Sequence, residues 1–157
     1  MDKFDIMEAE SAAGRDLRAQ FEDVLDEFGR LVRKALCLDE DGVSTFAVDD
    51  EFLVHLKYLD ESDTVVAFSP VGAFGGVGSP DAGEKALELL RLCELGGPTQ
   101  GFALALDEDA DLVLAMDRRT VLEISSVDAL AAWIEALIGA VRAVRDDFAN
   151  RFPAREV

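Results

Sequence analysis

Two short acidic connectors constrain the fold of this chain more than any other feature of its sequence. They separate three runs rich in β-branched and aromatic residues, VSTFAV (43–48), FLVHLKYL (52–59) and TVVAFSPV (64–71). In the middle run Phe52, Val54, Leu56 and Tyr58 alternate with Leu53, His55 and Lys57, which is the period of a strand with one buried face. Because the connectors DDE and DESD are too short for a crossover, the three strands are expected to form antiparallel hairpins.

Two long amphipathic segments lie towards the ends of the chain. Residues 17–38 repeat apolar side chains at steps of three and four, with acidic residues near the start and basic residues near the end, which complements the helix dipole. The second segment keeps the same spacing from Val127 to Phe148, with Ser125 or Ser126 as the N-cap. Both segments are predicted to be helices.

A shorter helix is predicted in the middle of the chain, and it is apolar on nearly all sides. Ser79 can cap it with Pro80 in the first position, and Gly96 and Gly97 are expected to end it. The apolar residues around its circumference are Leu87, Leu89, Leu90, Leu92, Cys93 and Leu95. Since a surface helix of a monomer buries only one stripe, the surplus indicates a homodimer, a groove for partner peptides, or both.

The segment GFALALDEDADLVLAM (101–116) predicts one more hairpin, with apolar residues in phase on both sides of the turn DEDAD. The predicted order is therefore α-β-β-β-α-β-β-α, an α+β fold with an antiparallel twisted sheet of about five strands and three helices. Residues 17–152 are expected to form this single domain, between a flexible acidic N-terminal tail (1–16) and a C-terminal tail (153–157).

The charge of the chain is strongly negative. Its 157 residues include 15 Lys and Arg against 33 Asp and Glu, a net charge of −18. Such a field repels nucleic acid and anionic lipid, so neither nucleic-acid binding nor membrane insertion is expected. No apolar run approaches the roughly 20 residues of a membrane span, and the acidic N-terminus lacks the apolar core of a signal peptide. A cytoplasmic location is predicted.

The glycine-rich stretch VGAFGGVGSPDAGEK (71–85) resembles a phosphate-binding loop at first sight. In the frame that begins at Gly78, however, Glu84 stands where a P-loop has its lysine, and neither Ser nor Thr follows Lys85. The preceding strand also belongs to an antiparallel series, which is the wrong context for a dinucleotide fold. The stretch is therefore interpreted as a flexible link.

The turn DEDAD spaces Asp107, Asp109 and Asp111 like the first half of a calcium-binding EF-hand loop. Leu112 and Arg118 stand where that loop needs its glycine and its closing glutamate. A solvated hairpin turn is the better interpretation, and no metal site is predicted.

No set of residues predicts catalysis. Cys37 and Cys93 lack the spacing of a metal site, and they are expected to be buried free thiols. His55 is the only histidine, so a His-rich metal site is excluded, and no serine or cysteine has an evident base partner. The chain is not expected to be an enzyme or to need a cofactor.

The closing sequence GFALALDEDADLVLAMDRRTVLEISSVDALAAWIEALIGAVRAVRDDF resembles the Tir chaperone (CesT) family, the class I chaperones of type III secretion. The shared pattern is a strand, an acidic turn, an LVL strand, a short segment and a long amphipathic helix. LDEFGRLVRKALCLDEDGVSTFAVDDEFLVHL is similar to the first helix and first two strands of the family. The resemblance extends over about residues 17–150.

This resemblance implies a small acidic homodimer in the cytoplasm, without enzymatic activity or a nucleotide requirement. Such a chaperone binds the N-terminal segment of a secreted effector, keeps it soluble and export-competent, and presents the complex to the secretion ATPase. An alternative is a YbjN-like regulatory or general protein-binding domain that has the same fold and no secretion role.

The resemblance also assigns two groups of residues. The predicted dimer interface consists of Leu87, Leu90, Leu92, Cys93, Phe102 and Leu104. The predicted effector-binding residues are Phe21, Val24, Phe28, Phe46 and Val48. Packing in the core is the alternative role for every one of them.

Overall fold

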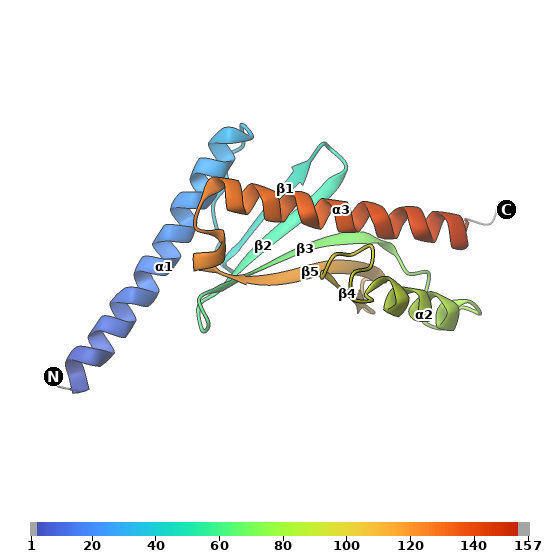
Figure 1. Cartoon of the computed structure of the whole chain (residues 1–157), viewed down its shortest axis with the longest axis horizontal. Helices are drawn as coiled ribbons and strands as arrows, with labels where there is room; N and C mark the ends of the chain where they lie inside the picture. Colours follow the sequence, from blue (N-terminus) through green and yellow to red (C-terminus); the bar gives the residue numbers. More distant parts are fainter. Residues whose placement is uncertain (1–2, 154–157) are drawn as a thin grey trace. The chain divides into compact units, whose positions relative to one another are not determined.

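The chain folds as an α+β protein with the predicted order of elements (Figure 1). The computed structural model describes residues 3–153, with side chains from Leu17 onward. The elements are α1 (Lys3–Leu31), β1 (Val43–Val48), β2 (Phe52–Leu59), β3 (Thr64–Ala73), α2 (Ala82–Leu92), β4 (Ala103–Asp107), β5 (Leu112–Thr120), the short 3₁₀ helix η1 (Val121–Ile124) and α3 (Val127–Arg151). The predicted fold class is confirmed, with η1 as an additional element.

The five strands form one sheet in the order β1-β2-β3-β5-β4. β4 lies at one edge of this sheet, where its register with β5 is antiparallel and runs from Ala103 opposite Met116 to Asp107 opposite Leu112. The turn between β1 and β2 is tight because Asp49 and Asp50 both adopt left-handed backbone angles, with φ of 55° and 54°. Aspartate tolerates this conformation better than most L-residues, which explains the two aspartates in this connector.

The start of α3 agrees with the sequence prediction, and the start of α1 differs from it. α3 begins directly after Ser126, whose Oγ accepts a hydrogen bond from the Ala129 N–H at 3.1 Å, so the predicted N-cap is confirmed. α1 begins at Lys3, whereas the sequence places the start of the first helix at Leu17. Residues 1–2 and 154–157 lie outside the described residues, and the division into two tails and one domain stays a prediction.

The middle helix α2 is shorter than predicted at both ends. It begins at Ala82, and the Ser79 hydroxyl donates to the Asp81 carboxylate at 2.9 Å, so the prediction that Ser79 caps this helix is wrong. The helix ends at Leu92, before Gly96, which has a φ of 77°. The segment from Cys93 onward therefore forms turns, and the last predicted leucine, Leu95, lies outside the helix.

The structure divides into two compact units, which are described separately. Unit 1 contains the chain up to Phe46 together with His55–Val66 and Arg118–Trp133. Unit 2 contains Ala47–Val54, Ala67–Asp117 and the chain from Ile134 onward. β1, β2, β3, β5 and α3 each contribute residues to both units.

In unit 1, α1 packs through aromatic side chains. Phe21 stacks on Tyr58 with ring centroids 5.9 Å apart, and Phe28 lies at the same distance from Phe46. All four rings are buried. Burying a side chain of this size stabilises a fold by about 1.5–3 kcal/mol, so this face of α1 belongs to the core of unit 1.

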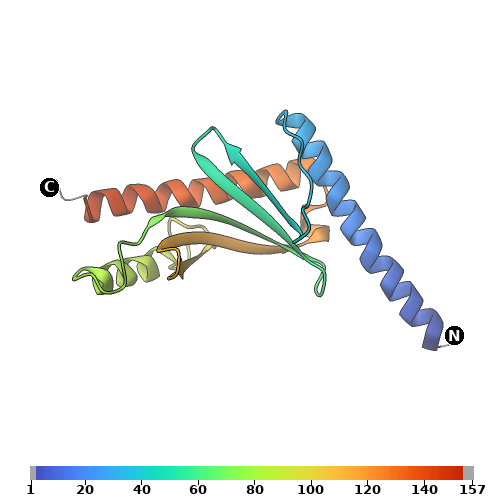
Figure 2. The ribbon, with the colours of Figure 1, turned by 180° about the vertical axis from the view of Figure 1, so that it is seen from behind.

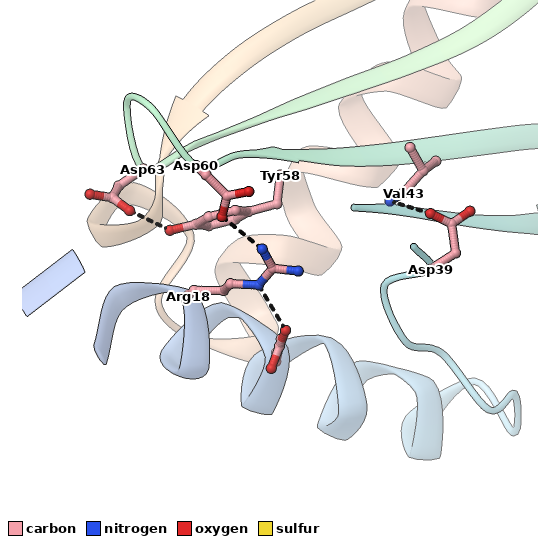
Figure 3. Close-up of polar contacts among 7 residues, drawn as sticks. Arg18, Asp39, Val43, Tyr58, Asp60 and Asp63 are labelled. Carbon is pink, nitrogen blue, oxygen red and sulfur yellow. Dashed lines mark hydrogen bonds and ion pairs between the residues drawn. The ribbon is translucent and has the colours of Figure 1, made fainter. Parts of the chain in front are cut away.

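Two groups of polar contacts lie beside this aromatic packing in unit 1, one around Tyr58 and one at the start of β1 (Figure 3). The Tyr58 hydroxyl donates to Asp63 at 2.6 Å, and Arg18 of α1 forms an ion pair with Asp60 at 2.7 Å. At the start of β1, Asp39 accepts a hydrogen bond from the Val43 N–H at 3.0 Å. The acidic connectors thus serve as hydrogen-bond acceptors for their own chain.

In unit 2, the core lies between the sheet and the second half of α3. Its buried apolar residues include Phe52, Val54, Ala67, Val71, Val113, Ala115, Leu137, Val141 and Val144. Arg142 and Arg145 of α3 lie over the Phe52 ring at 4.9 and 5.0 Å, and Arg145 donates to the Val71 carbonyl at 2.7 Å. These arginines cover the end of the core while their charged groups stay near water.

Candidate protein-binding groove

Two leucines of α2 point away from the core of their own unit. Leu87 is 49% exposed and Leu90 is 71% exposed, although both lie in a regular helix. A surface helix normally turns its leucines inward and its charges outward. α2 departs from this arrangement, because it buries Glu88 and leaves Leu87 and Leu90 in water.

Polar contacts within unit 2 hold α2 in this orientation. Glu88 is only 4% exposed, and its carboxylate forms an ion pair with Arg151 of α3 at 3.1 Å. Lys85 donates to the Phe74 carbonyl at 2.8 Å, and the buried Thr99 hydroxyl donates to the Leu92 carbonyl at 3.2 Å. Figures 1 and 2 both show α2 beside the C-terminal end of α3. Rotating the helix to bury its leucines would break these contacts.

An open apolar groove of about 270 Å³ lies between α2 and β4. Its lining residues are Phe74, Ala86, Leu89, Leu90, Cys93, Leu104, Ala105 and Leu106. None of them carries a formal charge, and Cys93 is the only titratable group, so the groove suits apolar contacts rather than acid–base chemistry. β4 is also the last strand of the sheet, which leaves one side of it without a neighbouring strand.

The predicted dimer residues fall into two classes. Leu90, Cys93 and Leu104 line the groove, and Leu87 is exposed on the same helix. Leu92 and Phe102, by contrast, are 5% and 4% exposed and belong to the core of unit 2. The periodic pattern could not separate these classes, because α2 buries residues on one side and exposes leucines on the other. Their role in a dimer stays a prediction.

Five residues of the groove were not predicted as site residues, namely Phe74, Ala86, Leu89, Ala105 and Leu106. Leu106 has the same strand phase as Leu104, so the alternation in β4 was a usable signal. Phe74 had no such signal, because it is a single aromatic residue inside the glycine-rich stretch. It is 3% exposed, and the fold brings it beneath the groove from the end of β3.

The predicted effector-binding residues lie mainly in the interior of the described chain. Phe21, Val24, Phe28 and Phe46 are buried, and Val48 is half-buried. The structure brings Phe21 and Phe28 onto the core face of α1 in unit 1 rather than into an open groove. Their assignment to effector binding stays a prediction, and core packing is the role that the geometry gives them.

A second apolar surface lies in unit 2 on the face of the sheet opposite the core. Along β3 and β5, the residues between the buried ones stay partly exposed; they are Phe68, Pro70, Leu112, Leu114 and Met116. Leu53 of β2 has the same phase and is 42% exposed. Because side chains alternate along a strand, this sheet has two apolar faces. One face packs in the core, and the other is partly exposed. We call these six residues the outer sheet face.

The other candidates for chemistry have structural explanations. His55 lies 2.8 Å from the Thr45 hydroxyl, and burial lowers the pKa of its imidazole below the usual 6.5. Both cysteines are free, and both are exposed, so the prediction that they are buried is wrong. Cys37 follows the end of α1 and Cys93 follows the end of α2, where the chain leaves the packed helix.

Among the side chains that the structure describes, from Leu17 to Pro153, no group of His, Cys, Asp and Glu is arranged to hold a metal ion. Over the same described range, no helix is long and apolar enough to cross a membrane. The aspartates of the DEDAD turn illustrate the first point. Asp107 accepts a hydrogen bond from Ala110 in its own turn, whereas Asp111 bonds to Gly75 and Gly76 of the glycine-rich stretch.

Solved structures with the same fold include known chaperone complexes. The chain is similar to a chain of the HopA1–SchA chaperone–effector complex, with a TM-score of 0.62 and 21% identity over 81% of this chain and 94% of that one. It is also similar to the Yersinia pestis type III secretion chaperone SycH bound to a YscM2 fragment, with a TM-score of 0.58 and 24% identity over 79% and 98%. YbjN from E. coli has a TM-score of 0.55 and 11% identity over 82% and 92%.

At these low sequence identities, the three solved structures show only that the fold is shared. The match of the sequence to a family model is more specific. No functionally curated protein shows significant sequence similarity to the chain. Residues 23–145, which are most of the chain, match the family model of the Tir chaperone protein family. The resemblance predicted from the closing strand–turn–strand–helix pattern is confirmed, and the chain belongs to the Tir chaperone protein (CesT) family.

Proposed function

We propose that this chain is a type III secretion chaperone that binds the N-terminal segment of a secreted effector and keeps it soluble and export-competent. The observation that carries the proposal is the exposed apolar surface of unit 2, in a family member with a net charge of −18. The related HopA1–SchA structure is a chaperone–effector complex, and SycH was solved with a bound fragment of YscM2, which supports an effector as the partner.

The groove between α2 and β4 is proposed as the contact with a second copy of the chain. A pair of molecules that each carry −18 repel one another, so they meet best at a surface without charge. The lining of the groove meets this condition, and Leu87 and Leu90 extend it along α2. A homodimer that buries these leucines removes the unfavourable exposure of the helix.

The outer sheet face is proposed as the first contact of the effector segment. It offers apolar side chains that are partly exposed, whereas Phe21 and Phe28 become accessible only if α1 leaves its packed position. The turn between β4 and β5 borders this face with the exposed carboxylates of Asp107, Glu108 and Asp109. A segment with apolar residues flanked by Lys or Arg therefore fits the surface better than an acidic one.

Co-purification tests this function. The chain is co-expressed with the N-terminal segment of the secretion substrate encoded beside it, and the expected result is a soluble complex in which that segment resists proteolysis. Leu114→Glu on the outer sheet face should abolish the complex, because binding would bury an unpaired carboxylate. Leu122→Glu is the control, since Leu122 is 70% exposed in η1 of unit 1. An intact complex with Leu114→Glu would reject the outer sheet face as the effector site.

Light scattering and sedimentation test the proposed dimer. The wild-type chain should be a dimer at micromolar concentration, and Leu90→Asp should raise the dimer dissociation constant by more than about 100-fold. Leu122→Asp is a matched control, because Leu90 and Leu122 are 71% and 70% exposed. Equal dissociation constants in the two variants would place the interface elsewhere.

We also propose that the protein has no catalytic activity and acts in the cytoplasm, where it presents its cargo to the secretion ATPase. Two of the solved structures with this fold contain chaperones, and the groove contains no acid–base pair. The alternative of a YbjN-like protein-binding domain without a secretion role has only the shared fold in its favour. Genome position separates the two, because a chaperone gene is expected beside the gene for its secreted substrate.

A further inference from the structure

Two motifs that resemble ligand-binding loops in the sequence bind one another in unit 2. The Asp111 carboxylate accepts hydrogen bonds from the backbone N–H groups of Gly75 and Gly76, at 3.1 and 2.8 Å. The Asp111 carbonyl also accepts a hydrogen bond from the Phe74 N–H at 3.0 Å. The glycine-rich stretch therefore does hold an anion, but the anion is a carboxylate of the turn between β4 and β5.

The backbone geometry of this contact depends on glycine. Gly75 and Gly76 have φ of 96° and 88°, which turns two successive N–H groups towards one acceptor, as in the anion-binding nests of other proteins. Asp111 itself has a φ of 54°. A Cβ atom on Gly75 would lie 2.8 Å from Nζ of Lys85, so a larger residue there would displace the end of the Lys85 side chain and would be strained by the positive φ.

Lys85 completes the contact from the other side. Its Nζ donates to the Phe74 carbonyl at 2.8 Å and lies 3.5 Å from the Asp81 carboxylate, with the side chain only 15% exposed. Both backbone groups of Phe74 are thus bonded, the N–H to Asp111 and the carbonyl to Lys85. The ring of Phe74 lies beneath the groove between α2 and β4.

We propose that Asp111 and Lys85 form a latch that sets the position of α2 relative to β4 and so keeps the groove open. Asp111 belongs to the turn that follows β4, Lys85 belongs to the first turns of α2, and Phe74 lies between them. The two walls of the groove are therefore joined through Phe74 and the two glycines that follow it. Asp111 and Lys85 are positioning residues, and their effect on dimerisation rests on the proposed role of the groove.

Hydrogen exchange in a monomeric background tests the latch without relying on the dimer. In Leu90→Asp protein, Asp111→Asn should speed amide exchange across residues 82–92 at least about fivefold, because it lowers the free energy of opening that segment. Asparagine keeps the size of the side chain and tolerates the left-handed backbone, but it replaces one acceptor oxygen with a donor. Asp109→Asn is the matched control, since Asp109 is an exposed carboxylate in the same turn.

The two cysteines provide a second measurement. Cys93 lines the groove, whereas Cys37 lies between α1 and β1 in unit 1. The alkylation rate of Cys93 should change in the Asp111→Asn and Lys85→Met variants. The alkylation rate of Cys37 should stay the same as in the parent Leu90→Asp protein. Lys85→Met keeps the apolar stem of the side chain and removes its bond to Phe74, so it tests the latch if Asp111→Asn fails to fold.

The outcomes separate the latch from the proposed function. Faster exchange confined to residues 74–76, with α2 and Cys93 unchanged in both variants, overturns the latch. Faster exchange in α2, combined with a Leu90 variant that dimerises like the wild type, supports the latch and rejects the groove as the dimer interface. If both ideas hold, Asp111→Asn without the Leu90 change weakens the dimer by about tenfold, and Asp109→Asn does not.

Discussion

At the scale of single residues, Tyr58 joins apolar packing to a polar contact in unit 1. Its ring stacks on Phe21, and its hydroxyl donates to Asp63 at 2.6 Å (Figure 3). Burial, followed by the bond to Asp63, raises the pKa of the phenol well above its usual value of 10.0. The hydroxyl is therefore a permanent donor, and the acidic turn between β2 and β3 is held against α1.

Tyr58→Phe should remove this bond and keep the ring. The expected loss is about 1.5–3 kcal/mol of unfolding free energy, since the acceptor is a carboxylate. Arg18→Met is the comparison, because its ion pair with Asp60 is exposed and should contribute less than about 1 kcal/mol. Urea unfolding of the three proteins measures both differences. An equal loss in the two variants would show that the hydroxyl has no special role.

His55 predicts a pH dependence in unit 1. Burial lowers the pKa of its imidazole in the folded chain below 6.5, so the unfolded chain takes up the proton first as the pH falls. The contribution of His55 to stability is thus complete above about pH 6.5 and decreases as the pH falls through that value. His55→Asn keeps a nitrogen near the Thr45 hydroxyl and has no such titration.

The comparison uses urea unfolding at about pH 7.5 and about pH 5.5, on either side of the ordinary histidine pKa. The wild-type chain should lose more stability over this interval than His55→Asn, and the carboxylates common to both proteins cancel from the difference. Equal pH slopes would mean that His55 titrates as freely in the folded chain as in the unfolded one.

At the scale of elements, the strands were predictable to within a few residues, because alternation and acidic turns are local signals. β1 and β2 match the predicted ranges, and β3 extends two residues further, to Ala73. The side of α2 that faces the core was not predictable. Its orientation depends on Glu88 meeting Arg151, which is a contact between distant parts of the sequence, and on Lys85 meeting Phe74 across the glycine-rich stretch.

The same limit applies to the candidate site. Leu90, Cys93 and Leu104 were predicted as parts of one dimer interface, and they line one groove, although their role in a dimer stays a prediction. Phe74 and Asp111 were missed as parts of one arrangement, since their motifs were compared with ligand-binding loops separately. Periodicity reports which residues share a face of one element, and it carries no information on which two loops meet.

The ion pair between Glu88 and Arg151 can be used to test what anchors α2. Arg151→Met should lower the melting temperature by a few degrees, because it leaves the Glu88 carboxylate in a buried position with a more distant partner. Arg91→Met is the control, since Arg91 lies 3.5 Å from the same carboxylate and is 63% exposed. Thermal unfolding measures both. A larger effect of Arg91→Met would mean that α2 is anchored by its own helix rather than by α3.

At the scale of the whole molecule, the acidic side chains and the exposed apolar surfaces lie in different places. The described acidic residues lie mostly at turns and on helix surfaces, where several of them accept hydrogen bonds from the backbone of the same chain, as Asp39 and Asp111 do. The apolar groove and the outer sheet face remain free of this charge. A protein of this kind stays soluble with apolar surfaces exposed, which is what a chaperone for an unfolded segment requires.

The net charge of −18 also predicts how stability responds to salt. Repulsion among unpaired carboxylates destabilises the compact state, and raising NaCl from about 10 mM to about 300 mM shortens the screening length from about 30 Å to below 10 Å. The melting temperature should therefore rise by roughly 2–6 °C. KCl at equal ionic strength should give the same rise, because screening does not depend on the cation. A fall with salt would show that exposed ion pairs such as Arg18–Asp60 outweigh the repulsion, and a rise with only one cation would indicate a specific ion site.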